Sequence, residues 1–230
     1  MGNSANIYGL DIEIDTRRGG LDPAVSTVLT VALCGPGFDD VFIGDESTIL
    51  RGLDTRLAAL PAGVLATWNG ATFDLPFIAD RARILGLELD LQLCLDRRLT
   101  LNRAPLPGHA GAYRGAWGHH AHLDTFRLYG GGVAGSNRMS LKTLGRLLGV
   151  GCHGGPADPT HDLANEALHA NAASDARLAR VLAQRRWNSA FRLIDRLDHD
   201  EAPPTRVDVR RPQRQARAEG QPLSPVTAGI

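Results

Sequence analysis

Two carboxylates near the start of the chain have a spacing that would suit a divalent metal ion. Asp11 and Glu13 lie within residues 7–14, where apolar and polar residues alternate as they do in a β-strand. The alternation places both side chains on one face, where they repel each other unless a cation lies between them, and carboxylate oxygens suit Mg²⁺ or Mn²⁺. Taken alone, the spacing favours the plainer interpretation of an acidic strand face in contact with solvent.

A third carboxylate, Asp74, follows an expected strand where the chain turns. Residues 64–68 form an apolar run typical of a buried strand, Asn69-Gly70 predicts a turn, and a helix is expected over residues 75–87. Asp74 is then a candidate N-cap of this helix, which would explain the residue without any functional role.

A fourth carboxylate, Asp175, lies in a region, residues 162–197, that we expect to be largely helical. Its spacing places it on the face that carries Leu178 and Leu182. A carboxylate on the apolar face of a helix requires a partner, and a metal ion is a suitable one.

The elements that must position these residues indicate an α/β domain that opens with antiparallel strands. The expected strands cover residues 7–14, 25–33, 40–43, 64–68 and 122–128, and the first three form an antiparallel meander. Two further helices are expected, over residues 45–60 and from Ser140 to Gly149. Residues 90–121, rich in Gly, Pro and His, are expected to form an irregular lid or binding insertion.

Composition bounds the class of protein. A chain of 230 residues with 43% hydrophobic residues fits one globular domain, expected over residues 1–197, followed by a disordered Arg/Pro-rich tail over residues 198–230. Lys+Arg and Asp+Glu balance at 25 each, so no overall positive field attracts nucleic acid, and Lys142 is the only lysine. Three cysteines, no long apolar run and no signal-like N-terminus predict free thiols and a cytoplasmic protein without a membrane segment.

The acidic residues stand in three motifs that together resemble those of a known family. The motifs are Tyr8-Gly9-Leu10-Asp11-Ile12-Glu13, then Trp68-Asn69-Gly70-x-x-Phe73-Asp74-Leu75-Pro76, then Asp175 in a C-terminal helix. In this order they resemble the exonuclease motifs of the DEDD superfamily of 3′-to-5′ exonucleases. Residues 122–126 and 140–149 are similar to segments of its family-B DNA polymerase-like exonuclease branch. The resemblance implies a ribonuclease H-like fold, a mixed sheet flanked by helices, over nearly everything except the tail.

The resemblance also implies an activity and a site. Asp11, Glu13, Asp74 and Asp175 would hold two Mg²⁺ or Mn²⁺ ions about 4 Å apart at the scissile phosphate. The substrate would be the 3′ end of single-stranded or frayed DNA or RNA, and a separate polymerase or repair complex is a candidate partner. The positions implied for substrate binding are Leu10, Asn69 and Phe73.

One position departs from the family pattern. In the tyrosine branch of the superfamily, a tyrosine four residues before the last aspartate orients the attacking water, and Asn171 stands there. Asparagine can hydrogen-bond to water, so Asn171 is counted with the catalytic residues, but it cannot ionise. The histidine branch would place its base at Ala170, and His169 is one position too early. Besides the exonuclease, two alternatives therefore stay open: a degenerate member that binds nucleic acid or a partner without efficient hydrolysis, and a plain α/β binding module.

The irregular segment carries further candidate residues. Arg97 and Arg103 are candidates for lining a substrate channel, as are Arg98 and Arg114, since guanidinium groups suit phosphate, although ordinary surface charge is an equal alternative. The histidines His109, His119, His120 and His122 are dense enough to suggest a zinc site, but their spacing does not pair them convincingly. Solvated loop histidines are the plainer interpretation.

Overall fold

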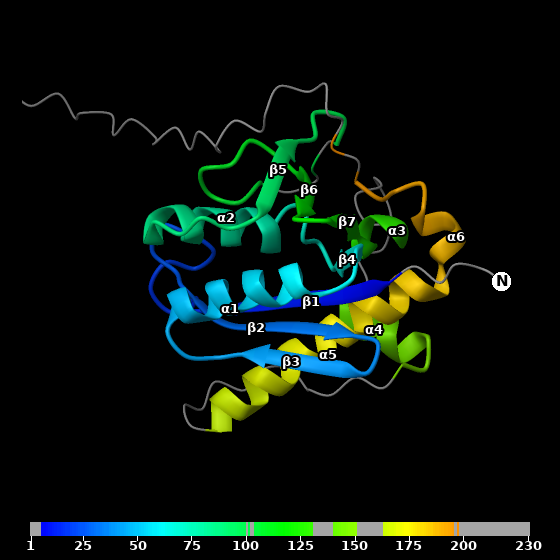
Figure 1. The fold of residues 1–230 in the computed structure, drawn as a ribbon, viewed down its shortest axis with the longest axis horizontal. Coiled ribbons are helices and arrows are strands. Elements are labelled where there is room, and N and C mark those ends of the chain that lie inside the picture. Colours follow the sequence, from blue (N-terminus) through cyan, green and yellow to red (C-terminus); the bar gives the residue numbers. More distant parts are fainter. Residues whose placement is uncertain are drawn as a thin grey trace, which may run out of the picture.

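One mixed β-sheet with helices on both faces makes up the described part of the chain. The computed structural model of the protein describes residues 6–99, 101, 104–130, 140–150, 163–195 and 197. The strands are β1 (Ile7–Ile14), β2 (Val28–Gly35), β3 (Phe38–Phe42), β4 (Gly63–Thr67), β5 (Leu91–Leu95), β6 (Tyr113–Trp117) and β7 (His120–Asp124). They form a seven-stranded sheet in the order β3-β2-β1-β4-β7-β6-β5 (Figure 1).

The strands pair in both directions. β1, β2 and β3 form the expected antiparallel meander, whereas β1 with β4 and β4 with β7 are parallel pairs. β5, β6 and β7 pair antiparallel and extend the other side of the sheet. The mixed sheet confirms the predicted α/β class and is consistent with a ribonuclease H-like fold.

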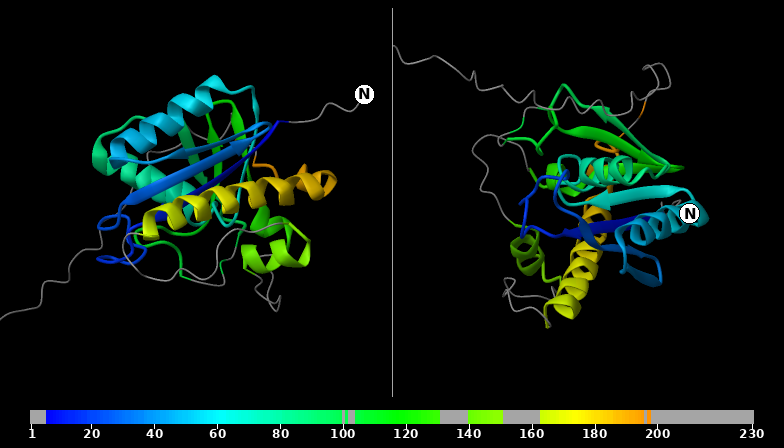
Figure 2. Two further views of the ribbon diagram at one scale, coloured as in Figure 1. Left: turned by 90° about the horizontal axis from the view of Figure 1, so that it is seen from below. Right: turned by 90° about the vertical axis from the view of Figure 1, so that its left-hand side faces the viewer.

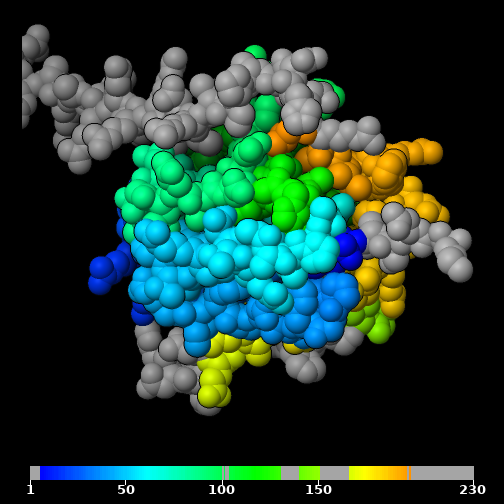
Figure 3. Space-filling view, in the orientation of Figure 1, coloured from blue at the N-terminus to red at the C-terminus, as the bar shows by residue number. Residues whose placement is uncertain are grey.

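The helices form a layer on each face of the sheet. They are α1 (Glu46–Ala59), α2 (Asp74–Leu85), α3 (Thr125–Leu128), α4 (Leu141–Leu147), α5 (Leu163–Arg185) and α6 (Trp187–Ala190). The long helix α5 crosses one face, with α4 packed beside it, and α1 and α2 lie on the other face (Figure 2). In the space-filling view, α1 and α2 lie side by side on the surface (Figure 3). No helix in the described ranges has both the length and the apolar character needed to cross a membrane.

Helix α1 shows why the sequence folds as it does beside the sheet. It begins after Asp45, whose carboxylate Oδ1 accepts a hydrogen bond from the Thr48 backbone N–H at 3.0 Å, as an N-cap does. Its apolar positions Leu50, Leu53 and Leu57 are fully buried in the core that the helix shares with β1 and β2. Burial of each such side chain contributes about 1.5–3 kcal/mol, so packing rather than helix propensity stabilises α1.

The alternation along β1 directs its two faces to different layers. Leu10 and Ile12 are buried in the core formed with α1 and α2, so Gly9, Asp11 and Glu13 face the layer of α5. A Cβ atom at Gly9 would lie 1.9 Å from the Ala176 carbonyl oxygen. Only glycine therefore lets α5 lie directly on β1, and this close approach brings the acidic face of β1 against the helix.

Helix α2 is fixed to α1 by a buried ion pair. The Arg81 guanidinium donates two hydrogen bonds to the Glu46 carboxylate, Nε to Oε1 at 2.8 Å and Nη2 to Oε2 at 2.6 Å. Its Nη1 donates to the Pro23 carbonyl oxygen at 2.8 Å, which ties down the loop between β1 and β2. A bidentate ion pair of this kind fixes the orientation of α2 relative to α1, and with it the position of the first residues of α2 against the sheet.

The structure corrects the expectation for residues 90–121. In place of an irregular lid or insertion, the described residues include β5 and β6, which extend the sheet. Four of the six Gly and Pro residues that suggested irregularity lie in residues 104–111, which are part of the connection between these two strands. The other two are Gly115 within β6 and Gly118 in the turn to β7. The apolar residues on either side pair as strands, because composition averaged over a segment hides two short strands within it.

Two smaller expectations are also corrected. The strand expected over residues 122–128 is β7 followed by α3, because the Asp124 carboxylate accepts from the Phe126 backbone N–H at 3.0 Å and begins a helix. Asp74 is the first residue of α2 rather than its N-cap, which is Phe73 and has no capping hydrogen bond. The expectation that residues 162–197 are largely helical is confirmed by α5 and α6. The expected tail of residues 198–230 lies outside the described residues.

Candidate metal centre

Two of the predicted site residues are placed by β1. Asp11 and Glu13 project from the strand face that α5 covers, on the same side as Gly9. Both are partly buried beneath the helix. The prediction that the two carboxylates share one face of a strand is therefore confirmed, and the solvent-facing alternative is wrong for this strand.

Asp175 comes to the same place from α5. Its neighbours Ala172 and Ala176 pack with Ala32 and Cys34 of β2, and these small side chains let the helix approach the sheet closely. The Asp175 side chain is 15% exposed. Its Oδ1 atom is buried and has no hydrogen-bond partner among the described residues. A buried carboxylate oxygen without a partner fits an additional ligand at this point.

The turn after β4 places Asp74. Asn69 adopts a left-handed conformation with φ of 68°, and its backbone N–H donates to Asp124 Oδ1 at 2.8 Å. The Ala71 N–H donates to the other oxygen of Asp124 at 3.3 Å. A Cβ atom at Gly70 would lie 2.1 Å from Thr67 Oγ1, so the turn requires glycine there. It ends at Asp74, the first residue of α2, which is only 3% exposed.

The charges show that the four carboxylates belong to one cluster. The pKa of Asp11 lies well above its usual value, first because the carboxyl is buried and then because Asp74, Asp175 and Glu13 place negative charge near it. Burial also raises the pKa of Asp175 to about 6, with Lys142 opposing the rise and Glu13 adding to it. We call Asp11, Glu13, Asp74 and Asp175 the carboxylate cluster. Buried carboxylates whose pKa is raised by neighbouring negative charge favour binding of a cation.

Asp74 has the second strongly shifted pKa in the cluster. Burial raises its pKa to about 7, and the nearby charge of Asp124 contributes in the same direction. Hydrogen bonds from its own backbone N–H and from that of Ile12 oppose the shift. Sequence reasoning assigned no role to Asp124, although its carboxylate organises the whole turn that leads to Asp74.

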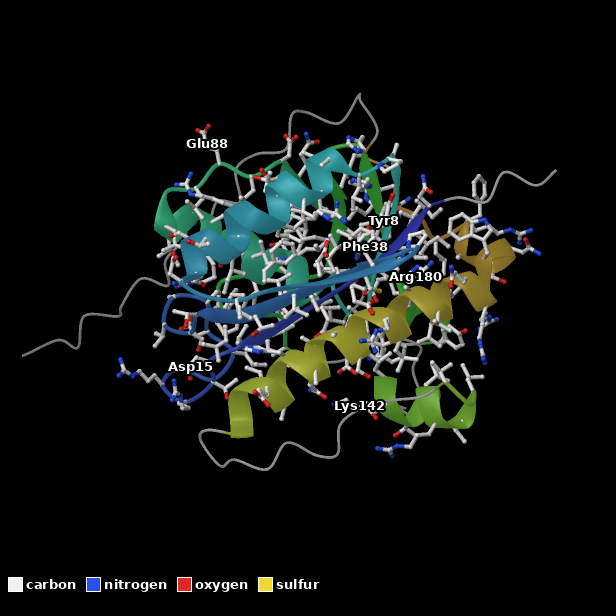
Figure 4. All side chains as sticks on the ribbon, turned by 60° about the horizontal axis from the view of Figure 1, so that its bottom comes forward. Tyr8, Asp15, Phe38, Glu88, Lys142 and Arg180 are labelled. Carbon is white, nitrogen blue, oxygen red and sulfur yellow. The ribbon has the colours of Figure 1, made fainter. Side chains whose placement is uncertain are left out.

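A lysine lies within the cluster. The Lys142 ammonium donates a hydrogen bond to Asn171 Oδ1 and lies 3.8 Å from Asp175 Oδ2. Asn171 in turn donates from Nδ2 to Glu13 Oε1 at 2.9 Å. Figure 4 shows Lys142 between α4 and α5. Sequence reasoning missed this role, and the available signal was that the chain's only lysine stands in a protein whose other basic residues are arginines.

The donor set fits a divalent cation by its chemistry. Four carboxylates offer the hard oxygen ligands that Mg²⁺ and Mn²⁺ prefer, and Asp175 Oδ1 is buried and unpartnered. In the present arrangement, however, no three His, Cys, Asp or Glu side chains of the described residues are grouped closely enough to hold one ion. The Lys142 ammonium is the cation that the structure places beside Asp175.

The residues predicted to contact substrate differ in where they lie and in how exposed they are. Asn69 lies at the turn, where its Oδ1 accepts from Thr72 Oγ1 at 2.7 Å, and Phe73 packs against Phe77 with ring centroids 5.7 Å apart. Leu10 is 0% exposed, and its side chain packs in the core. Arg97 is exposed, and Arg103 lies outside the described residues.

The other two arginines of that segment do not support a channel. Arg114 is buried against Cys94, with Nη2 at 3.5 Å from the sulfur. Arg98 pairs with Asp96, the Nε to Oδ1 distance being 3.4 Å. The expectation that Arg114 lines a substrate channel is therefore wrong, because β6 carries its side chain into the interior.

The histidines of residues 109–122 do not form a zinc site, because each ring bonds to a different partner. His119 and His120 contact the carbonyl oxygens of Leu60 and Leu57, at 2.7 and 2.9 Å. His109 lies between Asp80 and Tyr113, 3.0 Å from Asp80 Oδ2 and 2.9 Å from the tyrosine hydroxyl.

His122 belongs to a buried chain of hydrogen bonds. Its Nε2 lies 2.8 Å from Thr67 Oγ1 and its Nδ1 2.8 Å from Asp195 Oδ2. Asp195 Oδ2 also accepts from the Gly115 backbone N–H at 3.1 Å. The order of groups matches that of a hydrolase triad, but Thr67 is 0% exposed and no substrate can reach it. The chain of bonds instead fastens the segment after α6 to the sheet.

Comparisons with known proteins support the fold and go no further. No family model matches the chain, and no curated protein matches its sequence. Among solved structures, it is similar to the family B DNA polymerase from the hyperthermophilic archaeon Pyrobaculum calidifontis, with a TM-score of 0.62 and 20% identity. The match covers 80% of this chain and 25% of the polymerase chain, so the protein spans about a quarter of that polymerase.

Proposed function

We propose that the protein is a metal-dependent 3′-to-5′ exonuclease that removes nucleotides from single-stranded or frayed 3′ ends of DNA or RNA. The observation that carries the proposal is the convergence of Asp11, Glu13, Asp74 and Asp175, from β1, α2 and α5, around Asp11, whose pKa is raised by burial and by the negative charge of the other three. The motif resemblance and the fold similarity to a family B DNA polymerase support it. A separate polymerase or repair complex is a candidate partner.

The reaction adds water across the last phosphodiester bond. The water oxygen bonds to phosphorus, the bond to the 3′ oxygen of the neighbouring nucleotide breaks, and a proton goes to that oxygen. Mg²⁺ or Mn²⁺ ions held by the carboxylate cluster would stabilise charge on the attacking and leaving oxygens. Because burial raises the pKa of Asp74 to about 7, this carboxyl is partly protonated at neutral pH and would release its proton when a cation binds.

The turn beside the cluster is suited to hold the terminal nucleotide. Asp124 holds the backbone of Asn69, and Thr72 hydrogen-bonds to the Asn69 side-chain amide, so this side chain has one orientation in the turn that leads to Asp74. Phe73 is partly buried against Phe77, where its ring could stack on a base. These residues would orient the substrate, whereas the carboxylates act on the phosphate.

A second function is favoured by one observation. The Asn171 side chain is engaged at both ends, because its amide nitrogen donates to Glu13 and its oxygen accepts from Lys142. An asparagine held in this way has one N–H and one lone pair left for an attacking water, its orientation is set by Glu13 and Lys142, and it cannot serve as a base. The alternative is therefore a protein that binds nucleic acid or a partner without efficient hydrolysis.

The two functions are separated by degradation of a 3′-labelled single-stranded oligonucleotide with Mg²⁺ or Mn²⁺. We expect metal-dependent shortening by the parent, loss by about 10²-fold or more in Asp11→Ala, and no change in Glu88→Ala, which removes an exposed carboxylate on the opposite side of the molecule (Figure 4). Shortening only after Asn171→Tyr would favour the binding protein. Full activity in Asp11→Ala would show that the site is assigned wrongly.

A further inference from the structure

Lys142, the only lysine in the chain, lies beside the carboxylate cluster. Every other basic residue apart from histidine is an arginine, and none of the described arginines forms an ion pair with a carboxylate of the cluster. Lys142 alone does so, at 3.8 Å from Asp175 Oδ2. A lysine brings a compact charge on a flexible stem, whereas the planar fork of an arginine needs more room and a flat partner.

The contacts of Lys142 place it on one side of the cluster. Its ammonium bonds to Asn171 Oδ1, and Asn171 Nδ2 bonds to Glu13 Oε1, so the three groups form a chain from α4 through α5 to β1. Lys142 opposes the rise in the pKa of both Glu13 and Asp175. Asp74 is influenced instead by Asp124 and His122, which lie on the side of the turn.

Lys142 and a divalent ion compete for the same place. If Glu13 and Asp175 held such an ion, its two charges would repel the ammonium that now lies beside Asp175. The departure from the family pattern at Asn171 is linked to this feature, because the asparagine Oδ1 accepts a hydrogen bond from the Lys142 ammonium. A tyrosine at this position would present a ring and a distant hydroxyl rather than a short amide.

We propose that the Lys142 ammonium takes the place of a second divalent ion beside Glu13 and Asp175. The protein then binds one divalent ion, at Asp11 and Asp74. The inference rests on the proposed metal-dependent function and alters it, since the family resemblance implies two ions. It assigns Lys142 as a positioning residue that holds Glu13 and Asp175 through charge and through Asn171.

The test is the stoichiometry of Mn²⁺ binding, measured on the full chain by titration calorimetry and by the electron paramagnetic resonance signal of free Mn²⁺. The variants are Lys142→Met and Lys142→Gln, which remove the charge and keep most of the length. Arg146→Met is the matched control, since Arg146 is an exposed cation on the same helix. Circular dichroism establishes that each variant is folded, and ionic strength and pH are held constant.

We expect one Mn²⁺ per chain in the parent and in Arg146→Met. In Lys142→Met and Lys142→Gln we expect a second Mn²⁺, bound about tenfold or more tightly than any second ion in the parent. Two ions bound by the parent, with no change in either Lys142 variant, would overturn this inference and leave the metal-dependent function standing. A loss of stability without a change in stoichiometry would likewise overturn it, because Lys142 would then only fasten α4 to α5. No Mn²⁺ binding by any of these proteins would overturn both proposals.

Discussion

Replacing Asp74 by asparagine tests the electrostatic cost of the carboxylate cluster through protein stability. Asparagine has the same shape as aspartate, remains neutral at every pH and can still accept a hydrogen bond from the Ile12 backbone N–H. In the parent, burial raises the pKa of Asp74 from 3.8 to about 7 in the folded state. The unfolded chain is therefore already ionised at pH 5, whereas folded Asp74 keeps its proton until about pH 7.

The sign and size of the effect follow from proton binding. Between pH 5 and pH 7 the folded parent binds more protons than the unfolded parent, so its free energy of unfolding falls as the pH rises. Two pH units at about 1.4 kcal/mol each give a loss of about 3 kcal/mol from Asp74, complete by pH 8. In Asp74→Asn this loss is absent. Removing the Asp74 charge also lowers the pKa of Asp11, which acts in the same direction.

The measurement is urea unfolding of parent and Asp74→Asn from pH 5 to pH 8, followed by circular dichroism in the presence of a chelator. We expect the difference in unfolding free energy between variant and parent to shift in favour of the variant by about 3 kcal/mol across this range. The depressed pKa of His120 affects both proteins alike and cancels in the difference. Glu88→Gln controls for the loss of an exposed acid. A difference between variant and parent that is constant with pH would refute the reasoning.

Three further predictions concern packing, buried hydrogen bonds and the metal. Gly9→Ala should lower the unfolding free energy by about 3 kcal/mol or more, because the new Cβ would lie 1.9 Å from the Ala176 carbonyl oxygen. The control Gly111→Ala, whose Cβ would lie 3.5 Å from its nearest neighbour, should change the unfolding free energy little. Equal urea midpoints for the two variants would contradict this. Asp195→Ala should cost about 2–4 kcal/mol, because it leaves His122 Nδ1 and a backbone N–H buried without their acceptor, and an unchanged thermal midpoint would count against that role. Mg²⁺ at constant ionic strength should strengthen binding of a nuclease-resistant single-stranded oligonucleotide, measured by fluorescence anisotropy, and weaker binding with Mg²⁺ would oppose the proposed role of the cluster.

The features that could be predicted from the sequence are those set by neighbouring residues. The alternation along β1 gave the common face of Asp11 and Glu13, because a strand has a period of two and its apolar side must enter the core. The turn at Asn69-Gly70 was predictable, since glycine and asparagine tolerate the conformations that turns require. The mixed sheet was expected because the motifs, in this order, resemble those of a family with a ribonuclease H-like fold.

The features that could not be predicted depend on residues far apart in the chain. Lys142 and Asn171 are 29 residues apart, and Asn171 and Glu13 are separated by 158. Such contacts are set by how α4 and α5 pack on the sheet, for which local spacing carries no signal. The strands β5 and β6 were missed for a related reason, because each is short and becomes stable only by pairing with the other and with β7.

The zero net charge of the chain says little about whether it can act on a polyanion. What matters is the field at the carboxylate cluster, and this is set by groups within a few ångströms of it. The close packing of α5 on Gly9 forces Asp175 toward Asp11, so the folding energy of the core holds together charges that repel each other. Such repulsion favours positive charge near the cluster, and Lys142 is the cation that the chain itself supplies beside Asp175. Under the proposal made above, Lys142 sets how many further positive charges enter the cluster, and with them the attraction that the site exerts on a phosphate.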